Sequence, residues 1–291
     1  MKKYLLSKKK RSIFIYFTLL LVLLYFLSPF VWLLISSVQP EKDLTSVPPN
    51  WIPKHFTIRN YISFFNRELR HKMEITTAAG DIAPGLRNSL IIGIGVVLLN
   101  MILGIPAAYA FARFRYRVIF FFFLFLLFCR MVPAVAISIP FYLIMKELYL
   151  LDTVFVVILA HLSFTLPFTV WILRAYFITI PKDMEESARI DGCTRIGSLI
   201  RVVLPLSLPG LASAIILSFM FSWNEFLFAL ILTSTSASKT MPVIAALIAS
   251  DLMIKYGVIN ATGVITVIPA VVFTLAFAKC LRRGLTMGAI K

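Results

Sequence analysis

The side chains with the clearest chemical potential lie inside long apolar stretches of this sequence. Arg130 ends a run of phenylalanine and leucine residues, and Trp223, Asn224 and Glu225 lie in a second apolar run. A charge is costly in apolar surroundings, so it often marks a functional cavity. Arginine presents a planar fork that suits a carboxylate or a phosphate. We therefore expect Arg130 either to pair with Glu225 or to meet an anionic ligand.

Catalytic and metal-binding chemistry find no support in the rest of the chain. The histidines and cysteines are scattered and form no CxxC or Cys/His cluster: His55, His71, His161, Cys129, Cys193 and Cys280. A GxxxxGK[ST] loop, which would cradle nucleotide phosphates, is absent. We expect no enzyme activity, no metal and no cofactor bound by this chain, and a packing role for His161.

The composition is that of a membrane protein. The 291 residues include only 14% charged residues, against roughly 25% in a soluble domain, and the mean hydropathy is +0.91. Apolar runs of about 20 residues recur, and this length crosses a hydrocarbon core of about 30 Å. Lipid offers no water to an open backbone, so the spans should be helices. We expect an all-α, polytopic membrane protein.

Hydropathy predicts six spans, at 13–38, 88–111, 118–144, 153–173, 203–232 and 258–280. The first span is too long for the apolar core of a signal peptide, so we expect it to stay uncleaved. The predicted organisation is a tail, first span and external loop over 1–87, a core domain over 88–281 with a cytoplasmic loop over 174–203, and a tail over 282–291.

The distribution of charge predicts the orientation. With the N-terminus in the cytoplasm, the cytoplasmic segments hold 18 of the 29 lysine and arginine residues and four acidic residues. This asymmetry follows the positive-inside rule and places both termini in the cytoplasm. It also accounts for nearly all of the net charge of +16, so we expect no nucleic acid. Two long segments, 39–87 and 233–257, would face outward. The first carries a charged insert near 66–85, which either caps the protein or meets a partner.

The stretch 181–205 predicts two short amphipathic helices at the membrane surface. Pro181 suits a first helical turn, Gly192 suits a helix end, and Thr194 can cap the second helix. Helical spacing places four apolar residues of the second helix on one face: Ile196, Leu199, Ile200 and Val203. A generic interfacial helix pair has the same amphipathic pattern.

The individual residues of this stretch resemble a family signature. Glu186-Ser187-Ala188, then Gly192 after three residues, then Val202-Val203-Leu204-Pro205 after nine more, resemble the pattern of ABC importer permeases. That pattern reads Glu-Ala-Ala, three residues, Gly, nine residues, Ile, any residue, Leu-Pro. Ser187 and Val202 depart from it conservatively, since a small residue and a β-branched apolar residue are kept.

Further segments resemble the carbohydrate-importer branch of this family: Asn88-Ser89, Ile180–Lys182, Arg189–Gly192, Trp223–Phe226 and Gly284–Lys291. Together the matching residues extend from Asn88 to Lys291. They resemble the shorter, six-span permease of maltose-type importers, whereas the N-terminal third matches only in outline. The resemblance implies a type I importer permease fold in a bacterial cytoplasmic (inner) membrane.

The resemblance also implies partners. A second permease would pair with this chain, two ATPase subunits would bind beneath it and use ATP and Mg, and an external sugar-binding protein would deliver the substrate. The lipid bilayer would surround the spans. The sugar is either neutral or acidic, and Arg130 would suit an acidic one.

Residue roles carry over in three groups. Contact with an ATPase is implied for Glu185, Glu186, Ser187, Ala188, Asp191, Gly192, Leu204 and Pro205. A second ATPase contact in the C-terminal tail is implied for Gly284, Gly288 and Lys291. The third group is the substrate pathway, which would include Trp223, Asn224 and Glu225. Arg130 is placed in the pathway only because a charge inside an apolar run often marks a cavity, since this arginine is not part of the family pattern.

An ion-coupled secondary transporter is the alternative class. It would explain the spans, the orientation and Arg130, but it needs no ATPase-docking signature. Such transporters also often contain inverted repeats, and none is found in this sequence.

Overall fold

The computed structural model describes residues 2–48, 50–251 and 253–287, and every regular element in these ranges is a helix. The N-terminal elements are α1 (Lys2–Ser37), α2 (Glu41–Leu44), α3 (Arg59–Ile62), α4 (Arg67–Lys72) and η1 (Thr77–Asp81). The middle elements are α5 (Ile82–Arg113), α6 (Arg117–Cys129), α7 (Ala134–Glu147), α8 (Val154–Thr179) and α9 (Lys182–Ile190). The remaining elements are α10 (Arg195–Ser198), η2 (Leu199–Val203), α11 (Leu204–Leu206), α12 (Leu208–Trp223), α13 (Leu227–Leu232), α14 (Met241–Ala249) and α15 (Tyr256–Met287). The predicted all-α class is confirmed.

The described residues contain six helical segments long and apolar enough to span a membrane when each sharply bent helix pair counts as one. Four continuous helices are long and apolar enough to cross a membrane: Phe14–Ser37, Thr77–Arg113, Val154–Thr179 and Tyr256–Ala278. The third predicted span consists of α6 and α7, which meet at 95°, and the fifth includes a bend of 81° between Arg195–Leu206 and Leu208–Trp223. The predicted spans at 118–144 and 203–232 are therefore each divided by a sharp bend, and the predicted number of spans is confirmed for the described residues.

Proline explains where the third span breaks. Pro133 lacks a backbone N–H and cannot continue the helix that ends at Cys129. It instead precedes α7 with φ −58° and ψ 133°. The break places Arg130 directly after the end of α6.

The chain forms two compact units, which we describe separately. The first contains the residues up to Gly80 together with Ile248–Ile265. Within it, the Asn60 side chain donates to the carbonyl groups of Ser37 (2.8 Å) and Gln39 (3.1 Å). The Glu41 carboxylate accepts from the backbone N–H groups of Tyr256 (2.9 Å) and Gly257 (3.1 Å). Polar side chains thus link residues of this unit that lie far apart in the sequence.

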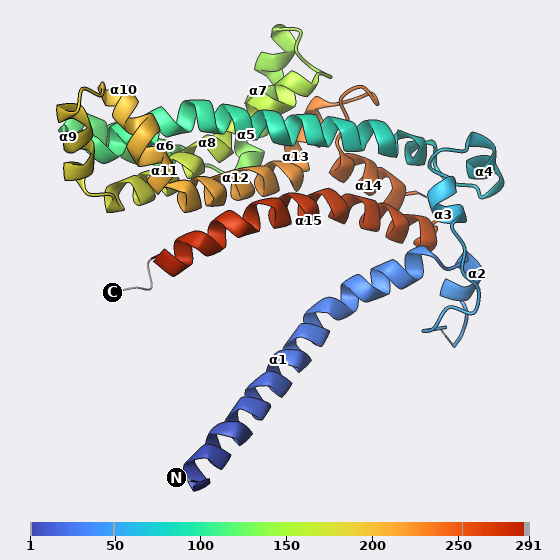
Figure 1. Ribbon diagram of the computed structural model, residues 1–291. Coiled ribbons are helices and arrows are strands. Elements are labelled where there is room, and N and C mark those ends of the chain that lie inside the picture. Colours follow the sequence, from blue (N-terminus) through green and yellow to red (C-terminus); the bar gives the residue numbers. More distant parts are fainter. Residues whose placement is uncertain (1, 49, 252, 288–291) are drawn as a thin grey trace. The chain divides into compact units, whose positions relative to one another are not determined.

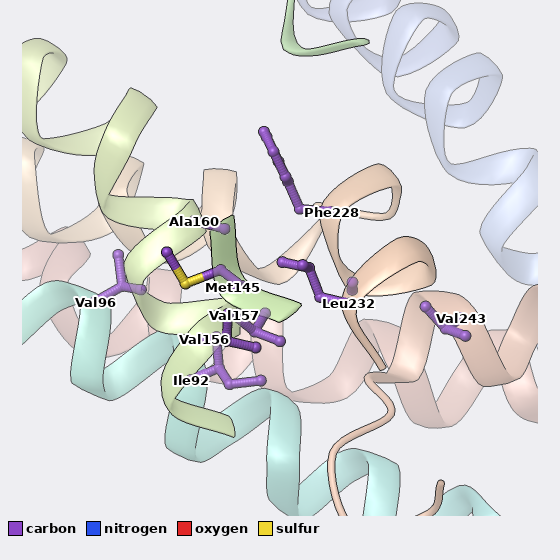
Figure 2. Close-up of a cluster of buried hydrophobic side chains, with 10 residues drawn as sticks. Ile92, Val96, Met145, Val156, Val157, Ala160, Phe228, Leu232 and Val243 are labelled. Carbon is purple, nitrogen blue, oxygen red and sulfur yellow. The ribbon is translucent and has the colours of Figure 1, made fainter. Parts of the chain in front are cut away.

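The second unit contains Asp81–Leu247 and α15 from Thr266 onward. Its core is the three-helix packing of α5, α8 and α12, which run alongside one another in Figure 1. One apolar cluster joins Ile92 of α5 to Val156 of α8 and Leu232 of α13, and Figure 2 shows their side chains converging. A second cluster joins Ala108 of α5 and Leu173 of α8 to Leu199 and Val203 of η2. The core therefore continues directly into the 181–205 stretch.

At the other end of this unit, polar contacts hold the segment 233–241. The Asp152 carboxylate accepts from the backbone N–H groups of Ser234 (2.9 Å) and Thr235 (3.0 Å), and also from the Ser238 hydroxyl. Partial burial opposes ionisation of this carboxylate, but the hydrogen bonds outweigh it and lower the pKa of Asp152 to about 2. Asn88 donates to the carbonyl groups of two further residues of the segment, so the segment is fixed to the starts of both α5 and α8.

The lowered pKa predicts how the Asp152 contribution depends on pH. A carboxylate whose pKa is lower in the folded state stabilises the fold above its unfolded value, near 4, and loses this effect as the pH falls toward 2. We expect Asp152→Asn to lower the melting temperature by roughly 2–4 °C at pH 7. The difference from the unchanged protein should shrink between pH 4 and 2 in melting curves in detergent. A difference that stays constant over this range would contradict the assignment, and Glu147→Gln serves as the control for loss of an exposed carboxylate.

Candidate coupling site and buried polar network

Glu185 fixes α9 to the end of α5. Its carboxylate forms an ion pair with Arg113, and the two side chains are only 8% and 9% exposed. It also accepts a hydrogen bond from the Tyr109 hydroxyl at 2.8 Å. Arg113 donates in addition to the carbonyl of Ile180, just before α9, at 3.2 Å. The sequence suggested an outward contact for Glu185, and the structure corrects this: the side chain points inward because Arg113 and Tyr109 hold it.

The bounds of α9 follow from its terminal residues. Pro181 lies at the N-cap with φ −57° and ψ 135°, one position earlier than the first turn where we expected it. The helix ends at Ile190, and Gly192 adopts a φ of +91° that favours glycine. The predicted stop at Gly192 is confirmed.

The second helix begins as predicted but continues differently. The Thr194 side chain accepts from the backbone N–H of Gly197 at 3.1 Å, so the predicted cap is confirmed. After Ser198 the chain turns into the π-helix η2, in which the N–H of Leu204 bonds the carbonyl of Leu199. The wider turn changes which side chains share a face.

The π-helical turn divides the expected apolar face. Leu199 and Val203 are buried in the core, whereas Ile196 is 70% and Ile200 57% exposed. The expectation that these four residues lie together is therefore wrong. Leu199 and Val203 thus pack against the spans, whereas Ile196 and Ile200 are exposed.

Four large apolar residues of the 181–205 loop are exposed: Met184, Ile190, Ile196 and Ile200. We call this group the outer face of the loop. Among the other predicted contact residues, Glu186, Ser187, Asp191, Gly192 and Pro205 are exposed, and Ala188 and Leu204 are half-buried. Clustered exposed apolar side chains often mark interaction sites.

The predicted C-terminal contact is only partly covered by the structure. Gly284 lies within α15. Gly288 and Lys291 lie outside the described residues. The contact stays a prediction.

Glu225 pairs with a histidine and not with Arg130. Its carboxylate lies 3.1 Å from His161 Nε2, and His161 Nδ1 lies 2.8 Å from the Ser222 hydroxyl. The carboxylate also accepts from the backbone N–H groups of Phe228 (2.8 Å) and Ala229 (3.1 Å), in the first turn of α13. Glu225 therefore satisfies the backbone where α12 breaks before α13. The predicted pairing of Glu225 with Arg130 is wrong, and the predicted packing of His161 is refined to a buried hydrogen-bonded role.

Arg130 is held by a carbonyl and two rings. Its Nη1 donates to the carbonyl of Phe164 at 2.6 Å. Its guanidinium carbon lies 5.0 Å from the ring centre of Phe168 and 5.2 Å from that of Phe221. No carboxylate pairs with it among the described residues. Arg130 is half-buried as a residue, and the bond to Phe164 uses only one of the donors of its guanidinium.

The neighbouring residues Trp223 and Asn224 differ in exposure, since the first is buried and the second is exposed. Trp223 is 2% exposed, stacks on Phe219 at 5.4 Å and donates through Nε1 to the carbonyl of Thr266 at 3.2 Å. The ring is thus buried against α15, and the place of Trp223 in the substrate pathway stays a prediction. Asn224 is exposed, and its side chain bonds the carbonyl of Met220 at 2.8 Å.

Two further polar pairs cross the helix core, and the sequence reasoning missed them. Asn100 of α5 donates to the Thr165 hydroxyl of α8 at 2.9 Å. The hydroxyl groups of Thr169 and Ser218 lie 2.8 Å apart, between α8 and α12. An amide inside an apolar span was the signal that could have revealed Asn100.

Comparison with known proteins identifies the family. Residues 100–286 match the family model of the binding-protein-dependent transport system inner membrane component. The chain belongs to this family. It is a multi-pass membrane permease of the ABC importer type, and the ion-coupled transporter alternative is set aside.

Curated relatives align over nearly their whole length. The trehalose transport system permease protein of Mycobacterium tuberculosis is 34% identical over 93% of this chain and 94% of the relative. The sulfoquinovosyl glycerol transport system permease protein of Agrobacterium fabrum is 33% identical over 91% and 89%. The trehalose/maltose transport system permease protein of Thermococcus litoralis is 32% identical over 91% of each.

Solved structures have the same fold. One is a chain of a bacterial ABC transporter involved in the import of the acidic polysaccharide alginate. It superposes with a TM-score of 0.77 at 22% identity, over 94% of this chain and 97% of that one. A bacterial alginate transporter in complex with its pentasaccharide-bound periplasmic protein gives 0.65 at 15% identity, over 94% and 96%. The predicted type I importer permease fold is confirmed.

The buried ion pair predicts a local loss of stability when one partner is removed. Glu185→Ala leaves the Arg113 charge buried without its partner, which is strongly unfavourable. We expect the backbone amides of residues 182–203 to exchange with deuterium at least about tenfold faster, measured by mass spectrometry. Glu186→Ala removes the adjacent exposed carboxylate and should leave this exchange nearly unchanged. Equal exchange in Glu185→Ala and the unchanged protein would contradict the anchoring role.

Proposed function

We propose that this chain is the permease subunit of an ATP-driven carbohydrate importer. It forms half of the translocation pathway and couples to a cytoplasmic ATPase through the loop 181–205. One observation carries this proposal: the loop is anchored to α5 through Glu185 while its outer face exposes apolar side chains. The loop signature of the family supports it further.

The anchoring suits a mechanical role. The ion pair ties α9 to α5, and Leu199 and Val203 tie η2 to the core between α5 and α8. A force on the outer face is therefore passed to two long spans at once. An ATPase that closes on ATP would shift the population between inward-facing and outward-facing states by this route.

Both termini are proposed to be cytoplasmic. The 181–205 loop and the connection between α5 and α6 lie at one end of the second unit, and Arg113, Arg115 and Arg117 lie in or beside that connection. The segment 233–241 lies at the other end, beside Asp152. The basic end would face the cytoplasm of a bacterial cell by the positive-inside rule.

The proposed partners are a second permease, two ATPase subunits and an external sugar-binding protein. The family description, which names a dependence on a binding protein, supports the last of these. ATP and Mg would be bound by the ATPase subunits. The tail from Gly284 to Lys291 would be a second ATPase contact.

The substrate is proposed to be a carbohydrate, because the relatives are named for trehalose, maltose and sulfoquinovosyl glycerol transport. Among the predicted pathway residues, Asn224 is exposed and Arg130 is half-buried. Arg130 has no carboxylate partner among the described residues, which favours an acidic sugar over a neutral one at this position.

Reversing a charge on α9 tests the coupling role. Glu186→Lys changes an exposed side chain beside the outer face, so we expect normal membrane insertion but uptake reduced at least about tenfold, as for loss of a charged interface contact. Uptake and ATP hydrolysis should be measured together in the reconstituted transporter. Glu147→Lys makes the same change at the far end of α7 and should leave hydrolysis coupled to uptake. Normal coupled uptake by Glu186→Lys would reject the proposed docking.

Arg130 tests the substrate class. If it meets an anionic group, Arg130→Gln should reduce uptake of an acidic sugar at least about tenfold, and of a neutral sugar far less. Competition assays with matched acidic and neutral oligosaccharides give this ratio. Arg130→Lys keeps the charge but not the planar fork, and should fall between the two. An equal loss of uptake for both sugars would mean that Arg130 stabilises the α6–α7 break and does not bind an anionic group of the substrate.

A further inference from the structure

A basic cavity lies where α5 connects to α6. Its volume is about 460 Å³, and it is lined by side chains of the 111–123 region and of the end of α8. Three arginines contribute to the lining: Arg115, Arg117 and Arg174. None of the three forms an ion pair with an acidic residue among those described. The cavity therefore holds positive charge that the described part of the chain does not neutralise.

Arg174 is held in place on the cavity wall. Its Nε donates to the carbonyl of Phe111 at 3.2 Å, and its guanidinium carbon lies 4.3 Å from the ring centre of Phe123. Only part of its donor fork is used by these contacts. Arg115, on the connecting segment, and Arg117, the first residue of α6, are exposed. The site thus combines one fixed guanidinium with two adaptable ones.

The first turn of α6 adds backbone donors to the same cavity. Arg117 is the first residue of this 13-residue helix, and the N-cap residue Tyr116 makes no side-chain capping bond. The first N–H groups of a helix lack intrahelical partners and favour a negative charge. Three residues of the first turn line the cavity: Arg117, Ile119 and Phe120. Phosphate commonly binds at such helix starts when basic side chains are present.

The surroundings of the cavity are apolar on the side that continues along α6. Val118, Phe120, Phe121 and Phe122 are each more than half exposed. The predicted six-span topology places this surface against lipid. Tyr116, which stacks on Phe114 with ring centres 6.4 Å apart, has the amphipathic character typical of the membrane interface. An anion with attached acyl chains fits this combination better than a free anion does.

We propose that this cavity binds the phosphate headgroup of an anionic phospholipid in the cytoplasmic leaflet. Arg115, Arg117 and Arg174 would pair with the phosphate, and the acyl chains would lie along the exposed phenylalanines of α6. The inference relies on the proposed orientation of the chain. The site adjoins the 181–205 loop, because Phe114 lines the cavity and also lies 4.9 Å from the Arg195 guanidinium carbon.

Direct lipid binding tests the site without reference to transport. The full-length chain in detergent is titrated with phosphatidylglycerol, phosphatidylcholine or inorganic phosphate and followed by native mass spectrometry. We expect phosphatidylglycerol to be retained in preference to phosphatidylcholine. The double variant Arg115→Gln/Arg117→Gln should bind phosphatidylglycerol at least about tenfold more weakly, since each basic residue contributes to attraction of an anionic lipid.

The control variant is Lys146→Gln, which removes an exposed positive charge at the end of α7, far along the chain from the cavity. It should bind phosphatidylglycerol as the unchanged protein does. Equal binding of both lipids, or unchanged phosphatidylglycerol binding by the double variant, would overturn the site. Displacement of phosphatidylglycerol by millimolar inorganic phosphate would overturn the lipid assignment in favour of a free anion. Because no transport is measured, these failures are distinct from a failure of the importer proposal.

Discussion

The buried ion pair between Arg113 and Glu185 is the interaction that holds the 181–205 loop to the membrane-spanning helix α5. It joins the last turn of α5 to the first turn of α9, and the Tyr109 hydroxyl completes the carboxylate's contacts. Removing one partner of such a pair costs about 3–5 kcal/mol, because the other charge stays buried. The loop and the span are therefore expected to move together, which a lever between an ATPase and the membrane helices requires.

The broken spans show a second constraint, which is the need to satisfy every backbone group within lipid. Where α12 ends before α13, the Glu225 carboxylate accepts the free N–H groups of the next helix. Where α6 ends before α7, Arg130 instead joins the break to α8 by donating to the carbonyl of Phe164. Charged residues that the sequence marks as possible ligand sites thus also stabilise the breaks. If Arg130 also contacts the substrate, it would do so through the guanidinium N–H groups that do not bond Phe164.

The features predicted correctly from the sequence are those set by local chemistry. Hydropathy alone gives the number of spans, and the residue types at Gly192 and Thr194 give the end of α9 and the cap of α10. The errors concern contacts between distant residues. Glu225 and His161 are 64 positions apart and Glu185 and Arg113 are 72 apart, so no periodic pattern links them. The π-helical turn of η2 likewise occurs where Leu199 and Val203 pack in the core. A helical wheel drawn with 3.6 residues per turn therefore places Ile196 and Ile200 on the wrong face.

The central claim is that the outer face of the 181–205 loop lies against an ATPase subunit. A photo-reactive amino acid placed at Ile196, which is 70% exposed, tests this most directly in the assembled transporter. A second probe at Ile139, exposed on α7, serves as the reference. We expect the Ile196 probe to form a covalent product with an ATPase subunit and the Ile139 probe to form none. Products of the Ile196 probe with lipid or with this chain alone would contradict the claim.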